Sequence, residues 1–280
     1  QDKARWVEKF GIGKQRTNII AEKIQAKKII EIIASYNKKV VTRQDPRVSA
    51  VLPNGSRFEG IMFDAVQNKP IFSIRKRPER VFTLDEYVQS NIITQKQKDF
   101  LVKSILDKKN ILIVGGTSSG KTTFINGCIN ELTETEDRVF LLEDTPELQC
   151  NILNSVFLTT THYVSMKMLL QSSMRLNPDR IIVGELRRGE ETLELLKAWN
   201  SGHAGGLSTI HANDCQSGLM KLEQYLAEVV ASDQKKTILE GVDIVVNLIK
   251  NEENKRVVRE IKLLKDYDEN KKEYVLEEIM

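Results

Sequence analysis

One stretch of the sequence has the residue types and spacing of a phosphate-binding loop. Residues 115–123 fit the pattern G-x-x-x-x-G-K-[ST]. Glycines let the backbone wrap closely around a phosphate, so that backbone N–H groups and a helix N-terminus face its oxygens. The stretch therefore predicts a nucleotide site formed by Gly115, Gly116, Thr117, Ser118, Ser119, Gly120, Lys121, Thr122 and Thr123.

Two side chains of this loop have chemistry of their own. Lys121 is expected to reach the β- and γ-phosphates of ATP, and the Thr122 hydroxyl is expected to bind Mg²⁺. The flanking residues supply the structure that the motif requires. Residues 111–114 are an apolar run typical of a buried strand, and apolar residues recur with helical spacing over 124–132. ATP and Mg²⁺ are therefore the expected ligands.

Two glutamates follow apolar runs farther along the chain. Residues 138–142 lead into Glu143, and residues 180–184 lead into Glu185. Because ligands in open α/β sheets bind beyond the carboxyl ends of the strands, we expect both acids beside the phosphate loop. We interpret both as catalytic groups and as Mg²⁺ ligands, direct or through water. Glu185 leads as the residue that orients or deprotonates water, and the reverse assignment with Glu143 stays open.

A glycine-rich stretch over residues 202–213 contains His203 and His211. No carboxylate or cysteine lies beside both, and their spacing is not that of a helical metal-binding pair, so zinc is not expected. We interpret the stretch as a switch that senses the γ-phosphate. His211 is its first candidate residue and is counted among the catalytic groups. The glycines would permit movement between nucleotide states.

The order of the expected elements indicates two domains. Residues 1–95 predict a small α+β domain, with a helix over 21–36, a hairpin around Asn54 and Gly55, and a strand over 70–75. Residues 96–280 predict an α/β domain of buried strands and amphipathic helices. The highly charged tail over 266–280 is expected to be peripheral.

Charge and composition narrow the classes of function. Residues 1–95 carry 18 Lys and Arg against 10 Asp and Glu, whereas the remainder carries 24 against 29. A basic N-terminal part suits phosphates, acidic lipid or an acidic neighbouring surface. No apolar run approaches the roughly 20 residues that span a bilayer. Three widely separated cysteines argue against a disulfide framework and for a reducing compartment.

Four sequence blocks resemble those of the secretion or traffic ATPases. They occur in the order that this family calls Walker A, aspartate box, Walker B and histidine box, at residues 115–123, 138–147, 177–187 and 202–212. The conjugative-transfer (TrbB) branch of the family is especially similar. That similarity is carried by residues 52–60, 72–77 and 195–203.

The resemblance implies a smaller PAS-like N-terminal domain followed by a RecA-like P-loop NTPase domain. It also implies that six copies of the chain assemble as a homohexameric ring. Such a ring would hydrolyse ATP to ADP and phosphate and power type IV secretion or conjugative transfer, through substrate translocation or pilus biogenesis. By the family pattern, Arg75 and Arg77 contact nucleotide phosphates, with Arg57 and Arg187 as secondary candidates. The expected setting is the cytoplasmic side of the inner membrane, with peripheral membrane contact and channel proteins as partners.

Two other classes of function are weighed against this one. A RecA-type nucleic-acid motor needs aromatic and basic strand-binding elements. The C-terminal part is acidic overall, so no sequence-specific nucleic-acid binding is expected. A scaffold that binds nucleotide without hydrolysing it is the second alternative. The presence of both Glu143 and Glu185 argues against it.

Overall fold

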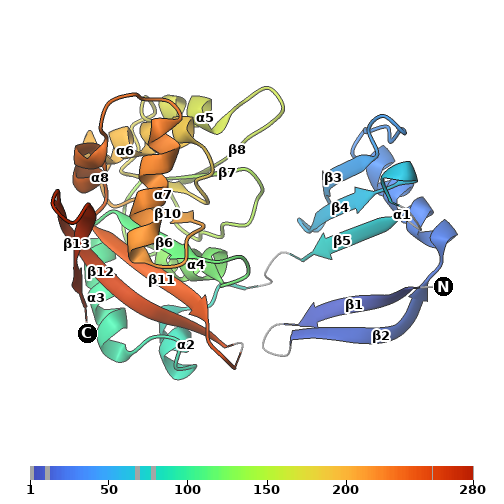
Figure 1. Ribbon diagram of the computed structural model, residues 1–280, viewed down its shortest axis with the longest axis horizontal. Helices are drawn as coiled ribbons and strands as arrows, with labels where there is room; N and C mark the ends of the chain where they lie inside the picture. Colours follow the sequence, from blue (N-terminus) through green and yellow to red (C-terminus); the bar gives the residue numbers. More distant parts are fainter. Residues whose placement is uncertain (1–2, 10–12, 67–69, 77–79, 254, 280) are drawn as a thin grey trace. The chain divides into compact units, whose positions relative to one another are not determined.

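The computed structural model describes residues 3–9, 13–66, 70–76, 80–253 and 255–279 (Figure 1). The chain forms two compact units, Gln1–Glu79 and Arg80–Met280. The division falls earlier than the boundary predicted at residue 95. The reason is that Leu84 and Tyr87 are buried in the core of the second unit, where the Tyr87 ring lies edge-on to Phe124 with 5.3 Å between centroids.

The N-terminal unit combines helix and antiparallel strands, as predicted. Its described elements are β1 (Lys3–Lys9), β2 (Gly13–Ala21), α1 (Lys23–Tyr36), β3 (Arg47–Val51), β4 (Arg57–Ile61), the 3₁₀ helix η1 (Phe63–Ala65) and β5 (Ile71–Arg75). β1 pairs with β2, and β3, β4 and β5 form a second antiparallel sheet. Ile30 and Ala34 of α1 pack with Val48 and Phe58. The predicted hairpin is confirmed, and its Gly55 has a left-handed φ of 78°.

The second unit is built on one eight-stranded sheet with the order β13-β12-β11-β6-β10-β9-β7-β8. Its strands are β6 (Ile111–Gly115), β7 (Val139–Glu143), β8 (Ser155–Thr159), β9 (Arg180–Val183), β10 (Leu207–Ile210), β11 (Ile244–Lys250), β12 (Arg256–Asp268) and β13 (Glu273–Glu278). The six strands from β11 to β8 run parallel, whereas β12 pairs antiparallel with β11 and β13 pairs antiparallel with β12. This confirms the predicted α/β class.

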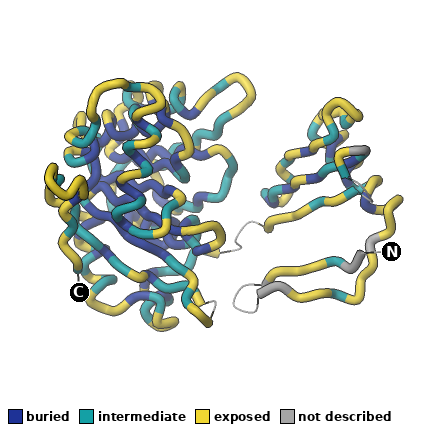
Figure 2. The backbone as a smooth tube through the Cα atoms, viewed as in Figure 1, coloured by how far each residue is buried: buried dark blue, intermediate teal, exposed yellow. Residues whose placement is uncertain are grey.

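Helices cover both faces of this sheet (Figure 1). They are α2 (Leu84–Gln89), α3 (Gln95–Leu106), α4 (Lys121–Asn130), α5 (Met166–Ser173), α6 (Gly189–Asn200), α7 (Cys215–Ala227) and α8 (Lys235–Gly241). Ile111 and Ile113 of β6 belong to one core cluster, whereas Leu112 and Val114 belong to the other. Alternate residues of a strand point to opposite faces, so β6 must be apolar throughout. Figure 2 shows the resulting buried band through the centre of the unit.

The charged C-terminal tail is not peripheral in the way predicted. β12 continues to Asp268, and β13 adds an edge strand to the central sheet. Tyr274 is buried, its ring lies edge-on to Tyr267, and its hydroxyl donates to Glu223 of α7. Burial alternates along the first residues of β13, with Tyr274 buried between the exposed Glu273 and Val275, so one face of the edge strand packs while the other faces solvent.

A buried arginine joins several segments at the amino ends of the parallel strands, whereas the phosphate loop lies at their carboxyl ends. Arg180, the first residue of β9, is 1% exposed. Its Nε donates to Asp137 at 2.5 Å, and its Nη1 donates to the carbonyls of Ile105 and Gly205 at 2.7 and 3.2 Å. Lys108 also pairs with Asp137 at 3.2 Å. The guanidinium thereby joins the end of α3, the loop before β7 and the glycine-rich segment before β10.

Replacing Asp137 by Asn should destabilise the second unit, because the guanidinium of Arg180 would stay buried without a charged partner. We expect the free energy of unfolding in urea to fall by about 3 kcal/mol. Glu277→Gln is the matched control, since it removes a carboxylate from an exposed pair with Lys265 and should change stability by less than about 1 kcal/mol. Equal effects of the two substitutions would contradict a special role for the buried pair.

Candidate active site

The phosphate loop has the backbone conformation that its sequence predicts. It leaves β6 at Gly115 and enters α4 at Lys121, and both Ser118 and Gly120 have positive φ, at 62° and 100°. A Cβ on Gly120 would lie 2.8 Å from Cδ of Arg256. Glycine is therefore favoured there twice, by its left-handed conformation and by the close approach of another side chain.

Lys121 is held at this loop by hydrogen bonds. Its side chain is largely buried, and its Nζ donates to the carbonyls of Gly115 at 2.8 Å and Gly116 at 3.1 Å. Nζ also lies 3.2 Å from Nδ1 of His211. Because a buried ammonium is costly without partners, these contacts fix where the positive charge sits. Oxygens of a bound phosphate could replace the carbonyls as acceptors.

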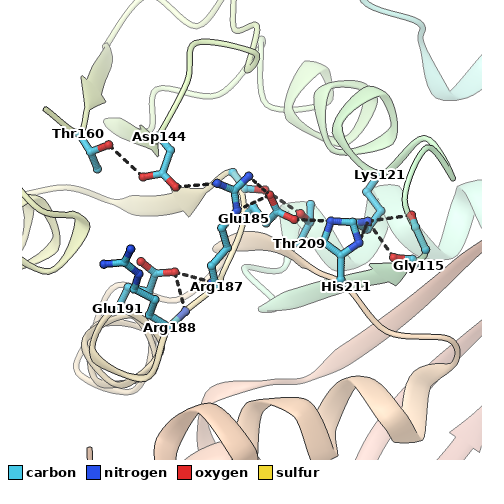
Figure 3. Close-up of polar contacts among 12 residues, drawn as sticks. Gly115, Lys121, Asp144, Thr160, Glu185, Arg187, Arg188, Glu191, Thr209 and His211 are labelled. Atoms are coloured by element: carbon cyan, nitrogen blue, oxygen red, sulfur yellow. Dashed lines mark hydrogen bonds and ion pairs between the residues drawn. The ribbon is translucent and has the colours of Figure 1, made fainter. Parts of the chain in front are cut away.

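His211 connects Lys121 to Glu185 (Figure 3). Strand β10 pairs in parallel with both β6 and β9, so the residues that follow these strands meet at one edge of the sheet. Nε2 of His211 lies 2.7 Å from Oε1 of Glu185. Partial burial, followed by the positive charge of Lys121, lowers the pKa of His211 below its ordinary value. The neutral ring expected at pH 7 donates from Nε2 to Glu185 and accepts at Nδ1 from Lys121.

The Glu185 carboxylate has a second partner, Arg187. The guanidinium donates from Nε to Oε2 of Glu185 at 2.9 Å, and it reaches Oδ2 of Asp144 from Nη1 at 3.2 Å. Oδ1 of Asp144 in turn accepts from the Thr160 hydroxyl at 2.9 Å. A continuous polar chain thus runs from Lys121 to the end of β8 (Figure 3). Arg187 was a secondary phosphate candidate from sequence, whereas the bridging role of Asp144 and Thr160 was not predicted.

Glu143 lies at the end of β7 but its carboxylate is engaged with the following loop. It is 5% exposed, and Oε2 accepts from the backbone N–H groups of Glu147 and Leu148 at 2.7 and 2.8 Å. A Cβ added to Gly184 would lie 3.3 Å from Cβ of Glu143. The two predicted acids therefore come from adjacent strand ends, but Glu143 has a clear loop-holding function that the sequence did not reveal.

The donor chemistry at this edge fits Mg²⁺ that arrives with a nucleotide. Within the described part of the chain, no group of three or more His, Cys, Asp or Glu residues is arranged to hold a metal ion. Mg²⁺ is usually bound by one or two protein oxygens together with phosphates and water rather than by a complete protein cage. The Thr122 hydroxyl in the first turn of α4 and the carboxylates of Glu143 and Glu185 are hard oxygen donors of that kind.

The predicted arginines belong to the N-terminal unit. Arg75 is the last residue of β5 and is exposed, and Arg57 begins β4 directly opposite it. Arg77 lies outside the described residues. The phosphate loop belongs to the other unit, so contact of Arg75 and Arg77 with a nucleotide stays a prediction.

Sequence reasoning missed one arginine that contacts the phosphate loop within the second unit. Arg256 begins β12, and its Nε donates to the Ser118 carbonyl at 3.4 Å while its Cδ packs over Gly120. The pairing of β11 with β6 explains the contact, since it brings Leu248 opposite Gly115 and the β11–β12 turn next to the loop. No local pattern around Arg256 signals this, because it depends on the strand order of the sheet.

Comparisons with known proteins identify the family of the chain. Residues 19–272 match the family described as type II/IV secretion system protein. The chain is 44% identical over 235 residues to the probable conjugal transfer protein TrbB of Sinorhizobium fredii, covering 83% of this chain and 72% of that protein. It is 42% identical over 248 residues to the conjugal transfer protein TrbB of Rhizobium radiobacter, covering 88% and 76%.

A solved structure supports the fold. The VirB11 ATPase of the Brucella suis type IV secretion system, crystallised with sulphate, superposes with a TM-score of 0.56 at 22% identity, over 92% of this chain and 85% of that one. The predicted fold class, a RecA-like unit that follows a smaller N-terminal unit along the chain, is thereby confirmed. The resemblance inferred from the four sequence blocks is confirmed by the family match. The chain belongs to the type II/IV secretion system protein family, as a TrbB-like P-loop ATPase of type IV secretion.

Proposed function

We propose that this chain forms a homohexameric ring that hydrolyses ATP to ADP and phosphate and thereby powers conjugative transfer, by moving substrate, building a pilus, or both. The observation that carries the proposal is the contact series Lys121–His211–Glu185 at the carboxyl edge of the sheet. It puts a phosphate-binding cation and a carboxylate on either side of one imidazole. The names of the two TrbB relatives support conjugation as the process served.

In this proposal, Lys121 exchanges the carbonyls of Gly115 and Gly116 for oxygens of the β- and γ-phosphates. Glu185 orients the attacking water and accepts its proton, and His211 couples the two groups by contacting both. Bound Mg²⁺ would neutralise phosphate charge, held by Thr122 with Glu143 and Glu185, directly or through water. The protein contributes chiefly position and charge, as in other phosphoryl transfers.

The N-terminal unit is proposed to supply further cations and outward contacts. Arg75 and Arg77 would bind nucleotide phosphates, because the planar guanidinium matches phosphate oxygens and stays charged. The exposed apolar side chains of Trp6 and Ile32, on a unit rich in lysine, are suited to peripheral contact with the inner membrane. No helix in the described part of the chain is long and apolar enough to cross a membrane. Channel proteins at the cytoplasmic face would be the partners.

Replacing Glu185 by Gln should lower ATP turnover by at least about 100-fold, because a positioned general base typically contributes that much or more. Binding of ATP, measured by equilibrium titration, should persist. Glu190→Gln is the control, since this exposed carboxylate pairs only with Lys167 among the described contacts and should leave turnover unchanged. Normal turnover by the Glu185 variant would refute its proposed role.

Lys121→Ala should instead lose nucleotide binding together with hydrolysis.

Replacing Arg256 by Ala should weaken ADP and ATP binding by a similar factor, about threefold to tenfold, because the loop would lose a hydrogen bond that fixes its shape before nucleotide arrives. Arg256→Lys should weaken binding less, since it keeps the charge and the packing of the stem over Gly120. The matched control is Arg259→Ala, an exposed arginine on the same strand. Equal affinities of the Arg256→Ala variant and the control would contradict bracing of the loop by Arg256.

The ring itself is tested by mass measurement of the full chain in solution with and without ATP and Mg²⁺. We expect a species of six 32.0 kDa chains in the presence of nucleotide. A mass of one chain under every nucleotide condition, at concentrations that support turnover, would contradict the hexamer without affecting the assignment of the catalytic residues.

A further inference from the structure

Both oxygens of the Glu185 carboxylate have protein partners in this structure. Oε1 contacts His211, and Oε2 accepts from Nε and Nη2 of Arg187. A carboxylate that is held in this way has little remaining capacity to bind and orient a water molecule. The Glu185 side chain is therefore restrained at both oxygens. His211 holds Oε1, and Arg187 holds Oε2.

Arg187 combines a fixed backbone with an exposed side chain. Its backbone N–H donates to Oε1 of Glu191, which also accepts from Arg188 N–H at 3.0 Å at the start of α6. The side chain is nevertheless 49% exposed. Because its backbone is held and its side chain is exposed to solvent, the Arg187 guanidinium can change partners without disturbing the fold.

The second partner of Arg187 marks where its guanidinium rests. Asp144, from the end of β7, accepts from Nη1 at 3.2 Å and is itself held by the Thr160 hydroxyl. One guanidinium thus joins acids from the ends of two neighbouring strands. Exposed ion pairs of this kind stabilise a fold by at most about 1 kcal/mol. A contribution to stability therefore does not explain why Arg187 bridges Glu185 and Asp144 beside the phosphate loop.

The γ-phosphate of ATP would compete for this guanidinium. It adds negative charge next to Lys121, at the same sheet edge as Arg187 (Figure 3). The planar fork of arginine binds phosphate oxygens bidentately and remains charged throughout. ADP lacks the terminal phosphate and so offers no such competitor at that position.

We propose that Arg187 is a positioning residue that restrains Glu185 in the absence of a γ-phosphate and releases it when the terminal phosphate of ATP draws the guanidinium away from Glu185 and Asp144. The inference rests on the proposed role of Glu185 and extends it, because it explains how water would be activated only when ATP is present. No bond is made or broken in this exchange of partners.

The test is the affinity of the full chain for ADP and for ATPγS, a slowly hydrolysed analogue that carries the terminal phosphate, with Mg²⁺ present. Arg187→Gln should weaken ATPγS binding by about tenfold, the loss expected for one charged hydrogen-bonded contact, and change ADP binding by less than twofold. Arg187→Lys should fall between, since it keeps the charge and loses the fork. Asp144→Asn should strengthen ATPγS binding severalfold, because it removes the competing anchor.

Arg188→Gln is the matched control, since this neighbouring exposed arginine makes no ion pair with Glu185 or Asp144 among the described contacts. Its ratio of ATPγS to ADP affinity should equal that of the unchanged chain. If Arg187→Gln weakened the binding of ATPγS and of ADP equally, the role of Arg187 would be structural only. If neither affinity changed, Arg187 would have no role at the nucleotide site. Because the readout is binding, these outcomes are separate from loss of turnover in Glu185→Gln, on which the proposed function depends.

Discussion

A buried ammonium must be hydrogen-bonded, and this requirement organises the site around Lys121. The loop meets it with its own carbonyls from Gly115 and Gly116 and with the unprotonated nitrogen of His211. The imidazole is neutral because burial and the nearby ammonium both oppose its protonation. A neutral ring has one donor left, and that donor fixes Glu185. The position of one cation therefore determines the tautomer of the histidine and the orientation of the acid.

Sheet topology makes this arrangement possible. Residues separated by about 90 positions in the chain meet because β10 lies between β6 and β9, and all three strands end at the same edge. The alternating burial of β6 residues in two core clusters holds that edge in place. At the amino ends of the strands, Arg180 donates a hydrogen bond to the carbonyl of Gly205 in the segment that leads into β10. The histidine is thus carried by a strand that is fixed at both ends.

Local patterns in the sequence were sufficient for the phosphate loop, its flanking strand and helix, and the two strand ends that carry Glu143 and Glu185. They failed where position depends on nonlocal pairing. The tail was expected to be peripheral because its charge dominates its composition, although alternate residues such as Tyr274 pack on the sheet. Neither the contact of Arg256 with the phosphate loop nor the bridging role of Asp144 was predicted, since both contacts follow from strand order and not from spacing.

The glycine that precedes Glu185 has a spatial explanation. A Cβ at position 184 would press within 3.3 Å of Cβ of Glu143, whose carboxylate holds the loop after β7. An acid at 184 would therefore crowd a buried carboxylate of the same charge, which disfavours both. The acid at position 185 instead contacts His211 and Arg187. This separation supports our proposal that Glu185 acts in the reaction, whereas Glu143 holds the loop after β7.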